Sequence, residues 1–333
     1  MELAMACVDS GVASANCLSI VRDADGDGIA ELRRTFLEGP KSPFGMTLMG
    51  DTLYIANTNS IVAFFHVEGE ISIAAKGEVI AALPSPPINQ HLTKDVIAGT
   101  GGTKIYATLK SNSNVGENGM KAETNRSAVL KIDLATRQSW IFASGLRNPN
   151  GLAWQPDTGA LWATVNKRDE IGSDLVADYI TSVRDGGFYG WPYSHNGQNV
   201  DVRAIPPRSD LVQSAIVPDY ALSAHTASLC LTFYTLALFP ESYRNGAFIG
   251  QRGTWNRNPP SGYKVIFVPL TESMPSGDPQ DILTGFVNEG GLAMGRRVGV
   301  VVDAPGALLV ADVVGNKVWR AVQNGSAVLG ANS

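Results

Sequence analysis

The chain has 333 residues, of which 44% are apolar, enough for a sizeable core in one large domain or two ordinary ones. Its 26 basic and 31 acidic residues give a net charge of −5, without the clustered Lys and Arg of a nucleic-acid surface. No apolar run reaches the ~18 residues that a membrane-spanning helix needs. The composition therefore argues against nucleic-acid binding and against a membrane span.

The first residues, 1–11, carry Glu2 where an export signal has basic charge, and their apolar stretch is short. We therefore expect no signal peptide in the chain as written. The three cysteines, Cys7, Cys17 and Cys230, lack the spacing of metal ligands. We interpret them as small apolar residues, with a pairing of Cys7 and Cys17 as the less favoured alternative.

An acidic loop follows, with Asp23, Asp25 and Asp27 at alternate positions and glycines between and after them. Carboxylates with this spacing, and Gly to allow a sharp turn, are how a short loop wraps calcium. The twelfth position is Arg34 rather than Glu, so the loop is not a complete EF-hand, and Glu31 at the ninth position would substitute. The loop predicts a structural calcium site, and a solvated acidic turn is the alternative.

A unit of strand, tight turn, strand, loop and strand recurs along the chain. Clear copies lie at residues 43–64, 150–165 and 298–320, and looser ones at 94–143 and 229–269. Their apolar runs are bounded by Gly, Pro and Asp, which is typical of strands that are buried on both faces. Degenerate repeats of roughly 40 to 50 residues indicate a β-propeller.

Other folds fit less well. No convincing helical period separates the strands, which disfavours a doubly wound α/β fold. The Gly-rich stretch 99–104 is not a phosphate loop, because Ile105 follows Lys104 where Ser or Thr is required. The sequence therefore predicts an all-β chain that forms a single β-propeller domain over residues 1–333.

Several short strings are more specific than the repeats. They lie at residues 22–28, 111–115, 145–149, 185–192, 253–257 and 310–312. In this order and spacing they resemble the glucose/sorbosone dehydrogenase family, and most closely its L-sorbosone dehydrogenase branch. The resemblance runs from about residue 14 to residue 322.

The resemblance implies a six-bladed β-propeller with pyrroloquinoline quinone (PQQ) over its central channel, held by a calcium ion. It also implies oxidation of an aldose sugar or a sorbosone-like sugar aldehyde, with electrons passed to an external acceptor. Members of the family are usually exported to the periplasm, so we expect a periplasmic or secreted protein.

The front of the chain is short relative to the family. We expect a poorly defined stretch at residues 1–13, a remnant of the first blade at 14–40 and closing strands at 298–322. The predicted ring has five complete blades and one incomplete blade that joins both chain ends. Its unpaired edge would expose Leu18 and Ile20 to pairing with other chains.

The resemblance also assigns roles to residues. His91 matches the catalytic histidine, and a histidine with a pKa near ~6.5 can take an O–H proton while hydride leaves carbon. Its alternative role is a loop histidine that binds a neighbouring backbone group. Arg147 and Asn148 match the pair that contacts the quinone, where a guanidinium shares the charge of reduction. The alternative for Arg147 is a strand end beside the Pro149 turn.

The calcium that holds the quinone is expected at Asn166, Lys167 and Arg168, through backbone carbonyls and the Asn166 side-chain oxygen. Lys167 stands where relatives usually carry Glu, which alters the local charge. Further residues match later channel-facing loops as quinone contacts: His225, Arg252, Trp255, Asn256 and Arg257. Arg252 stands where relatives usually have His, and Trp255 fits equally well as a rim aromatic packed between blades.

Two other functions remain open. An incomplete first blade could leave a catalytically idle propeller that acts as a binding or scaffold module. A calcium-dependent propeller lactonase is the third reading, but it would bring several acidic and Asn side chains to its metal. The Arg147–Asn148 pair and a lone His91 favour the quinone. Fold-level analogy alone does not decide between these functions.

Overall fold

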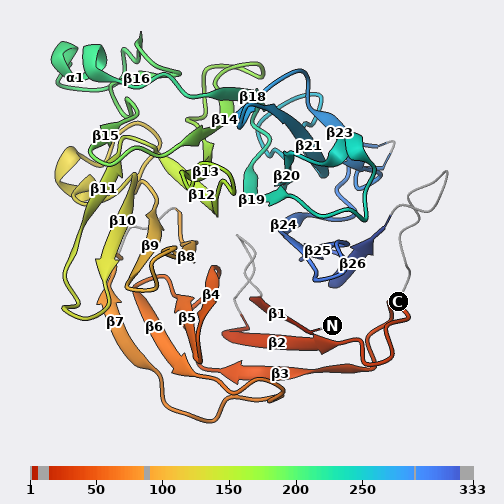
Figure 1. The fold of residues 1–333 in the computed structure, drawn as a ribbon. Coiled ribbons are helices and arrows are strands. Elements are labelled where there is room, and N and C mark those ends of the chain that lie inside the picture. The colour runs from red at the N-terminus through yellow and green to blue at the C-terminus, as the bar shows by residue number, and fades with distance from the viewer. Residues whose placement is uncertain (1, 7–14, 86–90, 289, 323–333) are drawn as a thin grey trace.

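The computed structural model describes residues 2–6, 15–85, 91–288 and 290–322, and Cys7 lies outside them. Strands dominate these residues, and their one α-helix is α1 (Ser209–Ser214). None of the described helices has the length and apolar character needed to span a membrane. The sheets follow one another in a ring around a common centre (Figure 1), so the predicted all-β propeller is confirmed.

Four sheets contain four or five strands and form complete blades. The first consists of β4 (Met46–Met49), β5 (Thr52–Ala56), β6 (Ser60–Phe65) and β7 (Glu78–Ala82). The second consists of β8 (Val96–Ala98), β9 (Lys104–Leu109), β10 (Ala128–Asp133), β11 (Ser139–Ser144) and β15 (Gly187–Phe188). All their neighbouring strands are antiparallel except β11 and β15, which are parallel.

The third complete blade consists of β12 (Asn148–Trp154), β13 (Leu161–Asn166), β14 (Ala177–Ser182) and β18 (Tyr220–Ala224). The fourth consists of β19 (Ser228–Tyr234), β20 (Gly246–Gln251), β21 (Lys264–Thr271), β22 (Met274–Pro275) and β23 (Gln280–Leu283). The small pair β16 (Ser194–His195) and β17 (Asn199–Val200) lies with α1 at the periphery of the ring (Figure 1).

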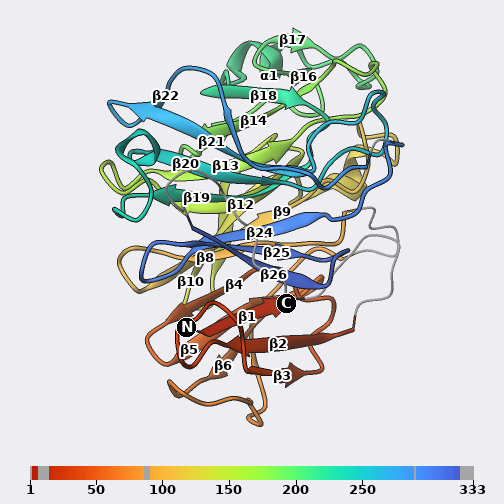
Figure 2. The same ribbon diagram turned by 90° about the vertical axis from the view of Figure 1, so that its right-hand side faces the viewer.

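The two ends of the chain form two separate three-stranded sheets. One consists of β1 (Glu2–Ala6), β2 (Cys17–Arg22) and β3 (Leu32–Glu38), and the other of β24 (Arg297–Val302), β25 (Leu308–Asp312) and β26 (Lys317–Ala321). They lie side by side in both views (Figures 1 and 2). Arg33 on β3 donates a hydrogen bond to Asn316 beside β26 across 3.2 Å.

The predicted blade shared by both chain ends is wrong, and the predicted number of blades is not confirmed. The described chain ends do not merge into one shared blade, because no pairing joins β1–β3 to β24–β26. The prediction of six blades, five of them complete, is not confirmed either, since the hydrogen-bonded sheets of the described residues give four complete blades and two sheets of three strands. The strands β2 and β3 lie within residues 14–40, and β24, β25 and β26 lie at residues 297–321.

The expectation of an exposed apolar edge at the first blade is also wrong. Residues 2–6 form β1 and pair with β2, so that strand has a partner on each side. Leu18 and Ile20 are fully buried and pack with Leu53 and Ile55 of the next sheet. Full burial of such a side chain stabilises the fold by roughly 1.5–3 kcal/mol.

Apolar clusters between successive sheets hold the ring together. The described residues give one such cluster at each of five junctions from β1–β3 round to β24–β26. The inner strands crowd at the channel, as Gly151 of β12 illustrates. It has a φ of +42°, and a Cβ there would lie 2.8 Å from the Cys230 backbone of β19. Glycine is therefore required where these two inner strands meet.

Candidate active site in the central channel

A cavity of about 630 Å³ opens at the end of the channel where loops from successive blades converge. Its volume falls in the usual range for small-molecule sites. Nine residues that the sequence predicted as site residues line it: His91, Arg147, Asn148, Asn166, Lys167, His225, Arg252, Trp255 and Asn256. They lie up to 165 positions apart in the chain, and the blade arrangement brings them together.

Hydrogen bonding fixes the tautomer of His91, which is half-buried in the cavity wall. Its Nδ1 lies 2.9 Å from the backbone oxygen of Ser111. A carbonyl oxygen only accepts, so Nδ1 carries the proton and Nε2 is left as the acceptor of the neutral ring. Burial, followed by the positive charge of Arg147, lowers the pKa of His91 from 6.5 to about 3. The ring is therefore neutral near pH 7.

Arg147 is the most tightly held cation of the cavity. It is 2% exposed and its backbone adopts φ +58°, a left-handed conformation that is uncommon outside glycine and clusters at functional sites. Nη2 donates to Asn114 Oδ1 at 2.9 Å and to Asp169 Oδ2 at 3.0 Å. Nε donates to the Asn114 carbonyl at 3.3 Å, and Nη1 donates to the Lys167 carbonyl. These bonds fix the plane of the guanidinium.

Two buried lysines add to the positive character of the site. Burial, followed by the charge of Lys94, lowers the pKa of Lys110 to about 7, and its Nζ donates to Thr93 Oγ1. Burial, followed by the charge of Arg147, lowers the pKa of Lys167 to about 7. With Arg147 and Arg252, they are four basic side chains in a cavity that four acidic ones also line: Glu117, Asp169, Glu170 and Asp178.

Two amide oxygens test whether a calcium ion fits. Asn148 begins β12 and Asn166 ends β13, and the two residues are register partners across the sheet. Their Oδ1 atoms are buried without a hydrogen-bond partner among the described residues. Unpaired amide oxygens are ligands that calcium takes. The Asn166 and Lys167 carbonyls already accept from Arg147 Nη1, so an ion there would share them with the guanidinium.

The later loops reach the cavity unevenly. His225 donates from Nε2 to the Gly172 carbonyl at 2.9 Å, and Asn256 donates to Asp169 Oδ1 at 2.8 Å. Trp255 is 77% exposed at the cavity edge and is not packed between blades. Two predicted residues are absent from the described lining. Arg257 pairs with Asp174 at 2.9 Å, and the Arg168 side chain pairs with Asp201.

Some cavity residues escaped the sequence analysis. Lys110, Asn114, Asp169 and Asp178 all line the cavity and contact its other residues. Asn114 lies inside the string 111–115, and Lys110 directly precedes it. That string was therefore the one signal that could have identified these two. Asp169 and Asp178 carry no comparable local signal, since isolated acids after strands are common.

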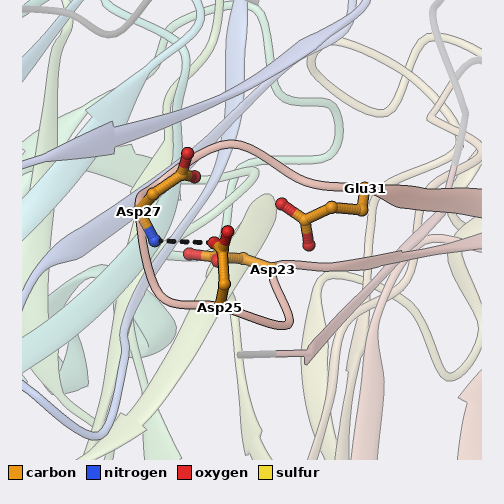
Figure 3. A group of neighbouring side chains, drawn as sticks. All are labelled: Asp23, Asp25, Asp27 and Glu31. Carbon is orange, nitrogen blue, oxygen red and sulfur yellow. Dashed lines mark hydrogen bonds between the residues drawn. The ribbon is translucent and has the colours of Figure 1, made fainter.

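The acidic loop between β2 and β3 gathers its four carboxylates, as Figure 3 shows. Ligand atoms of Asp23, Asp25, Asp27 and Glu31 all lie within 4.8 Å of one another. Asp23 is buried and accepts from the Gly26 backbone at 2.7 Å, whereas the other three carboxylates are exposed. The loop lies outside the cavity lining. The predicted ligand set is thus brought together, while calcium itself stays a prediction.

Comparison with known proteins gives two overlapping family matches. The family model described as TrAA12-like matches residues 6–183, and the one described as Glucose / Sorbosone dehydrogenase matches residues 118–252. An uncharacterized protein of Borreliella burgdorferi is 27% identical over 84% of this chain and 75% of its own length. The aldose sugar dehydrogenase YliI of Escherichia coli is 31% identical over 33% of this chain and 28% of its own length.

Solved structures share the fold. The calcium structure of a Trichoderma reesei enzyme of carbohydrate-active family AA12 has a TM-score of 0.78 at 16% identity, covering 95% of this chain and 91% of that one. The holo PQQ domain of Coprinopsis cinerea pyranose dehydrogenase has a TM-score of 0.76 at 17% identity, covering 90% and 86%. The PQQ-bound aldose sugar dehydrogenase of Streptomyces coelicolor has a TM-score of 0.63 at 16% identity, covering 92% and 87%.

At such identities these structures show the fold alone, and the L-sorbosone branch stays a prediction. The family matches carry more weight, because they rest on sequence along most of the chain. One spans more than half of it, and the other covers the loops that supply Arg147, Asn166 and His225. The chain therefore belongs to the TrAA12-like family and matches the glucose/sorbosone dehydrogenase family in its central part.

Proposed function

We propose that this chain is a PQQ- and calcium-dependent oxidoreductase of aldose sugars or sorbosone-like sugar aldehydes, with electrons passed to an external acceptor. The observation that carries the proposal is a neutral histidine in the cavity wall, whose Nε2 is left as an acceptor by the Ser111 carbonyl, close to the buried Arg147 guanidinium. The names of the AA12, pyranose dehydrogenase and aldose sugar dehydrogenase relatives support it.

The residues would divide the work of holding the cofactor. Arg147, Lys110 and Arg252 offer cations to the carboxylates and to the reacting carbonyl of the quinone. The Asn148 and Asn166 side-chain oxygens, with backbone oxygens of residues 166–168, would hold calcium. When bound, PQQ accepts a hydride from the substrate, the two-electron step that no protein side chain performs.

The role of His91 is to remove a proton. Nε2 takes the proton of the sugar hydroxyl at C1, or of an aldehyde hydrate, as the C–H electron pair leaves with its hydrogen as hydride. The oxygen then forms a double bond to carbon, which gives a lactone from an aldose or an acid from an aldehyde. The Ser111 carbonyl holds the ring in the tautomer that this transfer requires.

Two further proposals extend this function. We propose that the acidic loop binds a structural calcium through Asp23, Asp25, Asp27 and Glu31. We also propose that the protein works in the periplasm or outside the cell, as the family resemblance implies. Cell fractionation with an antibody against the native protein tests the second proposal, and recovery in the cytoplasm alone would contradict it.

Reconstitution tests the main proposal. The purified full chain is mixed with calcium and PQQ, and dye reduction is followed with a panel of aldoses and sugar aldehydes. We expect sugar-dependent dye reduction that requires PQQ and is lost with a chelator. Binding of PQQ without turnover of any sugar would favour the idle propeller. Hydrolysis of lactones with calcium alone would favour the lactonase.

A further inference from the structure

We propose that Asp169 is a positioning residue that orients the quinone-facing side chains Arg147 and Asn256. The inference rests on the proposed function for the identity of the ligand, but its geometry stands without one. Asp169 follows β13 in the loop that also carries Lys167, and its side chain is 21% exposed in the cavity.

The Asp169 carboxylate meets three of the side chains that line the cavity. Its Oδ2 accepts from Arg147 Nη2 at 3.0 Å, and its Oδ1 accepts from Asn256 Nδ2 at 2.8 Å. The His225 Nδ1 atom lies 3.5 Å from the same Oδ1. Arg147 directly precedes β12, whereas His225 precedes β19 and Asn256 lies in the loop after β20. One carboxylate therefore links two neighbouring blades.

Asp169 is itself held by a third blade. Its backbone N–H donates to Asn114 Oδ1 at 2.9 Å, and its carbonyl accepts from Asn114 Nδ2 at 3.2 Å. Asn114 lies in the loop between β9 and β10, and it also accepts from Arg147 Nη2 and Nε. The Arg147 guanidinium thus donates hydrogen bonds to both Asn114 and Asp169, which fix its orientation as well as its position.

Charge gives a second reason for this carboxylate. Arg147 is 2% exposed and has the buried cation Lys167 beside it, so its burial is costly without an ionised partner. Asp169 is the acid within ion-pair distance of Arg147 among the described residues. Replacing it with Asn keeps the size of the side chain, but it removes the compensating charge and puts an N–H donor in place of one of the two oxygens that accept from Arg147 and Asn256.

The test follows the Arg147 side chain directly in the quinone-free protein. In Asp169→Asn we expect hydrogen exchange at the Arg147 Nη2–H groups, measured by NMR, to accelerate at least ~10-fold, because the charge-assisted hydrogen bond from Nη2 to the Asp169 carboxylate is lost. Arg147→Lys identifies the resonance. Asp185→Asn is the matched control, since Asp185 pairs with Lys131 at 3.5 Å outside the cavity and is 63% exposed there. It should leave exchange at wild-type rates.

A folded Asp169→Asn protein that protects Arg147 as the wild type does would overturn the proposal. If that variant does not fold, Asp169→Glu serves instead, because it keeps the charge but moves the oxygens by one methylene. An unshifted Arg147 resonance in Asp169→Glu would equally overturn it.

With PQQ and sugar present we expect kcat to fall at least ~10-fold in Asp169→Asn and KM for the sugar to stay within ~3-fold, since only the reacting geometry changes. If the wild type binds no PQQ, the proposed function fails while the exchange experiment still decides the role of Asp169.

Discussion

At His91 a single hydrogen bond determines which ring nitrogen can act as a base. The Ser111 carbonyl requires a proton on Nδ1, so Nε2 accepts, and burial beside Arg147 keeps the ring neutral. The sequence identified His91 and Arg147 only through the resemblance to the family, because nothing local in 89–94 specifies a base. It could not indicate Asp169, whose partners lie up to 87 positions away.

Replacement of His91 by Ala is expected to lower turnover by at least ~10²-fold, because the proton acceptor is lost. Binding of PQQ should stay within a few-fold, since the cations that hold its carboxylates remain. Steady-state dye reduction and a PQQ titration measure the two effects. His66→Ala, on a half-buried histidine outside the cavity lining, is the control and should keep wild-type activity. Unchanged turnover in His91→Ala would remove His91 from the mechanism.

Titration of His91 also predicts how stability depends on pH. Its pKa is about 3 in the folded chain and 6.5 as the ordinary value, so the unfolded chain binds more protons between these values. Its contribution to stability is therefore complete above pH 6.5 and is lost progressively as pH falls toward 3. Urea unfolding at pH 4, 5, 6 and 7 should show that the free energy of unfolding falls less steeply with decreasing pH in His91→Gln than in the wild type. Equal slopes would contradict this.

Lys167 predicts how stability depends on pH above neutrality. Its buried Nζ has no hydrogen-bond partner among the described residues, and its pKa falls from 10.5 to about 7. Lys167→Met should stabilise the fold at pH 7 by ~1–3 kcal/mol, because the cost of burying an ammonium group that no hydrogen bond satisfies is removed. The gain should shrink as pH rises from 7 toward 10.5, where the wild-type ammonium no longer has to lose a proton on folding. Urea unfolding at pH 7 and 9.5 measures both, and a destabilised variant at pH 7 would refute the prediction.

Among the elements, the first sheet shows what sequence pattern can and cannot supply. A remnant of the first blade was predicted at residues 14–40, and β2 and β3 lie within that range. β1 was missed because Glu2–Ala6 consists of residues common in helices and has no flanking turn signal. Only its pairing with β2 makes it a strand, and that contact is tertiary.

Burial of β2 predicts a large effect at Leu18. Leu18→Ala should destabilise the fold by ~2–5 kcal/mol, because the side chain is fully buried against the next sheet. Val79→Ala on β7, where Val79 is 61% exposed, is the control and should change stability by less than ~0.5 kcal/mol. Urea unfolding compares the two. Similar small losses in both variants would restore the exposed edge that the sequence suggested.

The loop between β2 and β3 makes its own prediction. If it holds calcium, Asp25→Ala should lower the calcium stoichiometry by one ion per chain and lower Tm in calcium but not in a chelator. Metal analysis after dialysis and thermal unfolding measure these effects. Unchanged stoichiometry and unchanged Tm would leave the loop a solvated acidic turn.

For the whole molecule, repeats along the chain were sufficient to predict a propeller, because each unit needs neighbours to bury its apolar faces. They did not fix how the ends divide between blades, since three-stranded sheets at both termini satisfy the same local pattern. The site arises only at this scale: residues from 44 to 256 reach one cavity because the ring brings loops of successive blades to one end of the channel.

A single-turnover experiment tests the central claim most directly. The full chain is loaded with calcium and PQQ without oxygen, and one aldose or sugar aldehyde at a time is added while the quinone absorbance is recorded. We predict that at least one sugar bleaches the oxidised-quinone absorbance by one equivalent per bound PQQ in the wild type. In His91→Ala the oxidised-quinone absorbance should persist with the same sugar. An oxidised spectrum that persists in the wild type with every sugar tried, despite bound PQQ, would contradict the proposed function.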